Sequence, residues 1–192
     1  MQSPATIILL NGISSAGKTS ISTVLHRTKE TPYLQVSIDA FENMLPERYE
    51  EGGPFAWELL FPKLLRGFHR SIAALASTGN DLIVDHVMVH REGWESTLAD
   101  CAAVLEPFRV YFVGVHCSLE EAKRREQLRG DRYVGTAERQ FPRIHRHRLY
   151  DIEVDTTAAS PQACAEQIRA FIDNHPPSAF ARIRVWSPES IP

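Results

Sequence analysis

The 192-residue sequence has little of several features that mark particular classes of protein. Its three cysteines, Cys101, Cys117 and Cys164, are odd in number, far apart and set among apolar neighbours, which argues against a disulfide framework or a zinc site and favours reduced core thiols. No apolar run approaches the length of a membrane span, and no basic region precedes the first apolar stretch. We therefore expect a cytoplasmic protein with no membrane partner.

Other signatures are also missing. The net charge of −3 gives no overall attraction to nucleic acid, and no internal repeat or low-complexity segment is visible. No G-x-G-x-x-G follows a strand, which argues against a dinucleotide-binding Rossmann domain, and no asparagine begins the guanine-reading N-K-x-D. The composition, 43% hydrophobic and 23% charged, is typical of one globular domain with a sizeable core.

The most specific motif present is residues 12–19, which match G-x-x-x-x-G-K-[ST] with Gly12, Ile13, Ser14, Ser15, Ala16, Gly17, Lys18 and Thr19. The apolar run 6–10 before it predicts a strand buried on both faces. The residues after it have the apolar spacing of a helix, with Ile21, Val24, Leu25 and Thr28 at i, i+3, i+4 and i+7. Strand, glycine loop and helix together predict a phosphate-binding loop.

This arrangement has a direct chemical use. Gly12 and Gly17 can adopt conformations closed to residues with a Cβ, so that successive backbone N–H groups point at an anion at the positive end of the helix. Lys18 would reach the β- and γ-phosphates of a nucleoside triphosphate, and the Thr19 hydroxyl would ligate Mg²⁺. We predict ATP as the nucleotide.

Apolar strands and helical patterns alternate along the chain. Strands are predicted at 6–10, 33–38, 82–85, 108–117 and 152–155, and helices after residue 19, at 40–45, from about Pro62, around 94–105, within 118–148 and at 162–174. This order predicts a doubly wound, five-stranded parallel α/β sheet with flanking helices. We expect a kinase domain over 1–175 and a C-terminal tail over 176–192, where Ile183, Val185 and Trp186 alternate like an edge strand.

Two aspartates are predicted at strand ends, where ligands bind in such sheets. Asp85 is placed to help hold Mg²⁺, with a helix cap or a surface ion pair as the alternative. Asp39 could accept the proton of an acceptor hydroxyl, although Asp39 with Glu42 three residues later is also a capping pattern. We expect both aspartates in one cleft with the glycine loop.

Positive charge is concentrated between residues 123 and 148, where nine Lys or Arg face three acids. Such a tract is often only a solvated helix face, and it can also bind nucleic acid, but no interleaved aromatic residues follow the stacking pattern that single strands require. Arg125, Arg129 and Arg132 follow one another at four- and three-residue spacing beside Gly130. We favour a lid over about 118–148 whose arginines close on phosphates.

Four histidines and a set of apolar residues are further candidates for a role at the site. His86 and His90 have the spacing of a metal pair but no third ligand nearby, whereas His145 and His147 are expected on the basic face. Six apolar residues are predicted near the cleft mouth, where they could line an acceptor pocket or belong to the core: Phe41, Met44, Phe55, Trp57, Phe61 and Met88.

The sequence resembles the chloramphenicol phosphotransferase family. The resemblance rests on the motif at 10–18, Asp39, the segment 113–117, Arg125-x-x-x-Arg129-Gly130-Asp131-Arg132 and Tyr150-Asp151-x-Glu153-Val154-Asp155-Thr156-Thr157. It implies a fold similar to nucleoside monophosphate kinases and shikimate kinase, and transfer of the γ-phosphate of ATP to the 3-hydroxyl of chloramphenicol. It also implies that Asp39 is the general base, that Arg129 and Arg132 are lid cations, and that Asp155, Thr156 and Thr157 lie near the adenine.

Two other functions remain open at this point. The fold alone does not separate a small-molecule O-kinase from a nucleotide or nucleoside kinase. A nucleotide-gated switch or assembly NTPase is a third possibility, disfavoured by the missing guanine motif and by the lack of a second domain to move.

Overall fold

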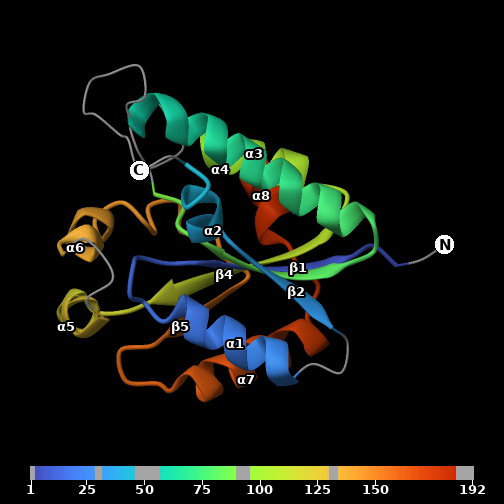
Figure 1. The fold of residues 1–192 in the computed structure, drawn as a ribbon. Coiled ribbons are helices and arrows are strands. Elements are labelled where there is room, and N and C mark those ends of the chain that lie inside the picture. Colours follow the sequence, from blue (N-terminus) through green and yellow to red (C-terminus); the bar gives the residue numbers. More distant parts are fainter. Residues whose placement is uncertain (1–2, 29–31, 46–56, 90–95, 130–133, 185–192) are drawn as a thin grey trace.

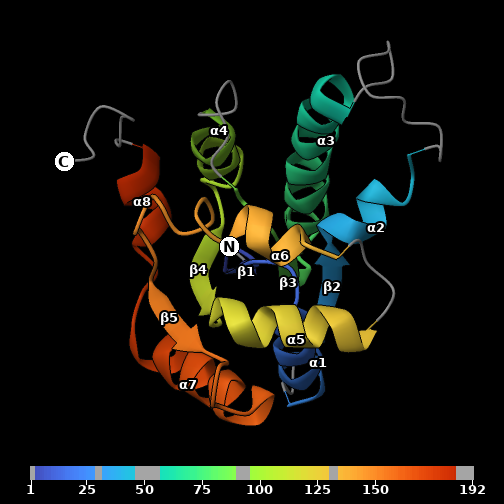
Figure 2. The same ribbon diagram turned by 90° about the vertical axis from the view of Figure 1, so that its left-hand side faces the viewer.

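The computed structural model describes residues 3–28, 32–45, 57–89, 96–129 and 134–184. Its centre is a five-stranded sheet in the order β2-β3-β1-β4-β5, in which every pairing is parallel (Figure 1; the strand order is clearest in Figure 2). The strands are β1 (Thr6–Asn11), β2 (Tyr33–Ser37), β3 (Asp81–His86), β4 (Arg109–His116) and β5 (Ile152–Asp155). The predicted parallel five-stranded sheet is confirmed.

Helices cover both faces of this sheet, as a doubly wound fold requires. Helices α1 and α7 pack on one face and α3, α4 and α8 on the other, while α5 and α6 lie at the carboxyl edge of the strands (Figures 1 and 2). Their bounds are α1 (Lys18–Thr28), α2 (Ile38–Glu42), α3 (Trp57–Ser77), α4 (Ser96–Val104), α5 (Leu119–Arg129), α6 (Thr136–Gln140), α7 (Pro161–Asn174) and α8 (Ala179–Arg184). Within the described residues, none of these helices has the length and apolarity needed to cross a bilayer.

The central strand β1 shows why its sequence is continuously apolar. Successive side chains point to opposite faces, so Ile8 and Leu10 join the core beneath α1 and α7, whereas Ile7 and Leu9 join the core beneath α3 and α4. All four are fully buried. Both faces therefore need apolar residues, and the strand cannot alternate with polar ones.

Two elements differ from the sequence-based expectations. Helix α3 begins at Trp57, so Pro62 lies inside it and not at its start. Phe61, only 6% exposed, packs into the core beside this proline, and that burial offsets the hydrogen bond that proline cannot donate.

The edge strand predicted in the tail is wrong where the structure describes the tail. Residues 179–184 form helix α8 and not an edge strand, with Phe180 and Ile183 buried against the sheet. The carboxylate of Asp151 fixes the start of this helix, because its Oδ1 accepts hydrogen bonds from the backbone N–H groups of Ser178 at 2.6 Å and Ala179 at 2.9 Å. Val185 and Trp186 lie outside the described residues.

Candidate functional site

The glycine loop between β1 and α1 has the backbone that a phosphate cradle requires. Gly17 has φ of +88° and Ser15 has φ of +62°, so the chain turns sharply before entering the helix. Gly12 lies so close to β4 that an added Cβ would approach the Val115 carbonyl oxygen to 2.4 Å. Only glycine fits this position, which explains the first glycine of the motif.

The two side chains that close the motif are already held near one carboxylate. Lys18 is only 6% exposed, and its ammonium donates hydrogen bonds to the carbonyl oxygens of Gly12 and Ile13, both at 3.0 Å. It lies 3.6 Å from Asp85 Oδ1, and the Thr19 hydroxyl donates to Asp85 Oδ2 at 2.7 Å. Asp85 is therefore neither a helix cap nor a surface ion pair, since it is buried between these two residues.

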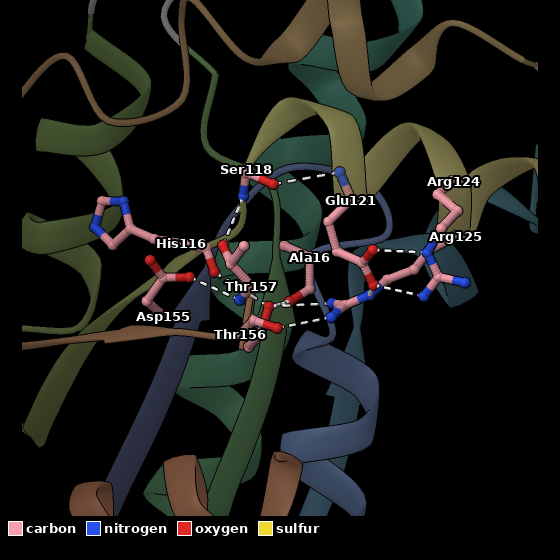
Figure 3. Close-up of polar contacts among 9 residues, drawn as sticks. All are labelled: Ala16, His116, Ser118, Glu121, Arg124, Arg125, Asp155, Thr156 and Thr157. Atoms are coloured by element: carbon pink, nitrogen blue, oxygen red, sulfur yellow. Dashed lines mark hydrogen bonds and ion pairs between the residues drawn. The ribbon is translucent and has the colours of Figure 1, made fainter. Parts of the chain in front are cut away.

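Arg125 of α5 reaches across to the end of β5 (Figure 3). Its Nη2 donates to the Thr156 carbonyl at 2.7 Å and its Nη1 to the Thr156 hydroxyl at 3.1 Å, while its Nε donates to Glu121 at 2.7 Å. Arg124 also donates two hydrogen bonds to the Glu121 carboxylate, both at 2.7 Å. The hydrogen bonds from Arg124, and secondly the one from Arg125, lower the pKa of Glu121 to about 2. Glu121 is therefore ionised at neutral pH and fixes the Arg125 guanidinium beside Gly17.

The turn after β5 is tied to the phosphate loop. The buried Thr156 hydroxyl donates to the Ala16 carbonyl at 2.7 Å (Figure 3). Asp155 accepts the Thr157 N–H at 2.7 Å, and its pKa is lowered chiefly by hydrogen bonds from Thr157. The Thr157 hydroxyl in turn accepts the N–H of Ser118 at 2.9 Å. This turn thus links β4, β5 and the loop.

A cavity of about 410 Å³ lies over the loop and gathers most of the predicted site residues. Those that line it are Ser14, Ser15, Gly17, Lys18, Thr19, Asp39, Asp85, Arg125, Arg129 and Thr156. Its other lining residues were not predicted: Ser20, Val87, Leu128, Ala159 and Pro161. Among the remaining predicted residues, Gly12, Ile13, Ala16, Asp155 and Thr157 do not line this cavity, and Arg132 falls outside the described residues.

Asp39 occupies the first turn of α2, but it is not the residue that caps this helix. The N-cap of α2 is Ser37, whose hydroxyl accepts the Ala40 N–H at 3.2 Å. The carboxylate of Asp39 therefore does not serve as the cap that the spacing to Glu42 suggested. It lies two residues beyond the end of β2, on the wall of the cavity.

His86 contacts another histidine, His69, which the spacing to His90 did not indicate. His86 is fully buried and shares a 2.9 Å contact between Nε2 atoms with His69 of α3, while His90 lies outside the described residues. Burial lowers the pKa of His86, and it lowers that of His69 to about 4. No cluster of three potential metal ligands occurs in the part of the chain that the structure describes.

His145 and His147 were expected on the basic face, but their rings pack against aromatic side chains instead. His145 Nδ1 lies 2.7 Å from the Tyr150 hydroxyl, and the His147 ring stacks on Phe112 at 5.3 Å between centroids. Burial is the main cause that lowers the pKa of His145 to about 3 and that of His147 to about 4. These rings face the interior because Phe112 and Tyr150 offer them apolar surface.

Asn11 is a site residue that sequence reasoning missed. It is fully buried, its amide oxygen accepts the Met88 N–H at 2.7 Å, and its amide nitrogen donates to the Tyr150 hydroxyl at 2.8 Å. A polar residue that ends an apolar strand directly before Gly12 was the available signal. Asn11 thereby anchors the first residue of the phosphate loop to two neighbouring segments.

Of the residues predicted for an acceptor pocket, those whose side chains the structure describes do not line this cavity, and the core alternative holds for Phe61 and Met88. Phe41 packs on Phe68 at 4.8 Å between ring centroids, and Phe61 and Met88 are buried in the core beneath α3. Met44 is 69% exposed. Phe55 and the side chain of Trp57 lie outside what the structure describes.

Comparison with known proteins places this chain in a family. A family model described as chloramphenicol phosphotransferase-like protein matches residues 5–173. A candidate O-phosphotransferase of Mycobacterium tuberculosis strain H37Rv is 34% identical to this chain, over 93% of the chain and 87% of that protein.

Solved structures agree on the fold. APS kinase CysC of Mycobacterium tuberculosis, in complex with AMPPNP and APS, superposes with a TM-score of 0.66 at 15% identity, covering 90% of this chain and all of that one. Shikimate kinase from Acinetobacter baumannii, in complex with shikimate, gives a TM-score of 0.56 at 15% identity over 88% and 93% of the two chains. The chain therefore belongs to the chloramphenicol phosphotransferase-like family and is a phosphotransferase with the fold of P-loop kinases.

Proposed function

We propose that the chain transfers the γ-phosphoryl group of ATP to a hydroxyl of a small molecule inside the 410 Å³ cavity. The observation that carries this proposal is that Lys18, Asp39 and Arg129 line one cavity although they come from α1, α2 and α5. A phosphate-binding cation, a carboxylate for the acceptor and a second cation are the groups that phosphoryl transfer needs.

The loop fits the phosphates of ATP. Ser14 and Ser15 line the cavity, and their hydroxyls are buried and have no hydrogen-bond partner within the described part of the chain. Buried hydroxyls of this kind are costly unless a ligand satisfies them, and phosphate oxygens are suitable acceptors. The AMPPNP in the APS kinase complex supports ATP as the nucleotide.

Magnesium fits the pair formed by Thr19 and Asp85. These two oxygens lie 2.7 Å apart, and a hydroxyl with a carboxylate beside a phosphate loop is a ligand set that Mg²⁺ accepts. When bound there, Mg²⁺ would neutralise charge on the phosphate oxygens. Lys18 lies 3.6 Å from the same carboxylate and would bring its ammonium to the β- and γ-phosphates.

Asp39 would orient the acceptor hydroxyl and take its proton. Since Ser37 caps α2, the fold does not need the carboxylate of Asp39 for that helix end. Arg129, which lines the cavity, would meet the charge that develops on the transferring group. Arg132, which lies outside the described residues, is proposed as a second cation for this charge. Asp155 and Thr157 would keep the turn after β5 in place beside the adenine.

The acceptor is the finer part of the proposal. Val87 and Leu128 give the cavity an apolar portion, and the family match makes chloramphenicol the first alcohol to test, ahead of other aryl alcohols. We measure ADP release from ATP and Mg²⁺ with chloramphenicol, with aryl alcohols, with nucleosides and nucleotides, and without an acceptor.

Each result of this panel has a defined meaning. Turnover that requires an alcohol supports the proposal, turnover with nucleotides alone indicates a nucleotide kinase, and slow turnover without acceptor indicates a switch NTPase. Lys18→Ala should abolish turnover with the fold intact, while Lys63→Ala, at an exposed position of α3, should keep it. Wild-type turnover in Lys18→Ala would overturn the site.

A further inference from the structure

A residue of the lid segment holds one of the backbone donors of the phosphate loop. Gln140 is the last residue of α6, and its amide oxygen accepts the Ser14 N–H at 2.6 Å. The two residues are 126 positions apart in the sequence. Gln140 lies outside the phosphate-loop motif and outside the arginine motif of residues 125–132.

The position of Ser14 gives this contact its significance. Ser14 lies between Ile13, whose carbonyl accepts from the Lys18 ammonium at 3.0 Å, and Ser15, whose φ is +62°. The Ile13 carbonyl and the Ser14 N–H belong to the same peptide unit. The Ser14 N–H therefore lies next to the Lys18 ammonium, the group that would reach the β- and γ-phosphates. Loop N–H groups at this point are the donors with which such a loop holds phosphate oxygens.

Helix α6 is also firmly connected to α5, which carries Arg125 and Arg129. Glu126 of α5 is 1% exposed, and its carboxylate accepts the N–H groups of Gly135 at 2.8 Å and Ala137 at 3.0 Å. Glu126 thus joins α5 to the start of α6, and Gln140 joins the end of α6 to the loop. Through α6, Ser14 is therefore connected to the helix that carries the arginines.

We propose that Gln140 is a positioning residue that couples the lid to occupancy of the phosphate loop. Its amide oxygen holds the Ser14 N–H, and a γ-phosphate oxygen displaces it when ATP binds. The exchange favours ATP because a hydrogen bond to a charged phosphate oxygen is roughly twice as strong as one to a neutral amide. Release of Gln140 then frees the end of α6 and lets α5 adjust over the nucleotide. This inference rests on the proposed nucleotide site.

Binding measurements with two substitutions and a matched control test the exchange. Gln140→Glu places a carboxylate on the Ser14 N–H, so affinity for AMPPNP should fall by at least about tenfold, and more than affinity for ADP, because of repulsion by the γ-phosphate. Gln140→Met removes the competing acceptor, so AMPPNP affinity should be kept or raised while kcat falls. Gln127→Glu, at an exposed position of α5, adds the same charge and should leave the AMPPNP-to-ADP ratio unchanged.

Hydrogen exchange reports the coupling without relying on turnover. In the wild type, exchange of the peptide 136–141 should change more with AMPPNP than with ADP, and this difference should disappear in Gln140→Met. A purely structural role would alter exchange equally with either nucleotide. Equal AMPPNP-to-ADP ratios in Gln140→Glu and Gln127→Glu, or an unchanged nucleotide response in Gln140→Met, would overturn the proposal. Failure of the wild type to bind AMPPNP would instead overturn the nucleotide site.

Discussion

Replacing His147 by phenylalanine should reduce the pH dependence of the free energy of unfolding between pH 7.5 and 5.0. Burial lowers the pKa of His147 from 6.5 to about 4 in the folded protein. The unfolded chain binds a proton at this histidine as pH falls through 6.5, whereas the folded protein binds it only near pH 4. Stability is therefore lost as pH falls across that window, and the loss ends below about pH 4.

The size of the effect follows from these two pKa values. Between pH 7.5 and 5.0, His147 should lower the free energy of unfolding by about 2 kcal/mol. A phenylalanine at the same place does not titrate and so causes no such loss. At pH 7.5 the substitution should change stability by no more than about 1 kcal/mol. It keeps the stack on Phe112 and removes a buried Nε2 that, in the described part of the chain, has no hydrogen-bond partner, but it loses the 3.1 Å bond from the Leu149 N–H.

Urea unfolding followed by circular dichroism at the two pH values measures this directly. The wild type should lose about 2 kcal/mol more than His147→Phe between pH 7.5 and 5.0. His26→Gln, at an exposed position of α1, controls for the removal of one titratable side chain and should lose as much as the wild type. Equal losses in the wild type and His147→Phe would show that this ring accepts a proton in the folded state and would refute the reasoning.

Three other predictions concern activity and packing. Asp39→Asn should lower kcat by about 10²- to 10⁴-fold in steady-state assays with little change in Tm, because Ser37 caps α2; a large fall in Tm with a modest loss of rate would contradict this. Arg129→Ala should lower kcat more than it raises the KM for ATP. An effect on KM alone would show that Arg129 binds ATP in the ground state and does not stabilise the transition state. Gly114→Ala should cost about 1–3 kcal/mol in thermal unfolding, because its Cβ would lie 2.8 Å from the Tyr150 ring, and unchanged stability would mean that the ring moves freely.

The loop of the proposed nucleotide site could be predicted from sequence because its determinants are local. Residues 12–19 form one contiguous loop, and the glycines, Lys18 and Thr19 all act within it. Asp85 follows from the rule that parallel strands bring their carboxyl ends to one edge of a sheet. Neither inference needs a contact between distant parts of the chain to be known beforehand.

The parts that sequence missed depend on long-range contacts. Asn11 and Tyr150 are 139 residues apart, and nothing in either neighbourhood announces their hydrogen bond. His145 and His147 sit among arginines in the sequence, so the charge pattern placed them on the surface, yet the aromatic rings of Phe112 and Tyr150 draw them inward. Helix α8 was missed because its N-terminal carboxylate, Asp151, lies 27 residues before it.

Strand β3 shows how one alternating pattern serves both the core and the chemistry. Ile83 and Asp85 point to the α1 side, where Ile83 is buried and Asp85 accepts from Thr19 at 2.7 Å. His86 points to the opposite side and contacts His69 of α3 at 2.9 Å. A shift of one residue in register would reverse both orientations, removing the carboxylate from the phosphate loop and placing it in the core beneath α3. The apolar residues that fix the register of β3 therefore also fix the position of the carboxylate on which the proposed Mg²⁺ site depends.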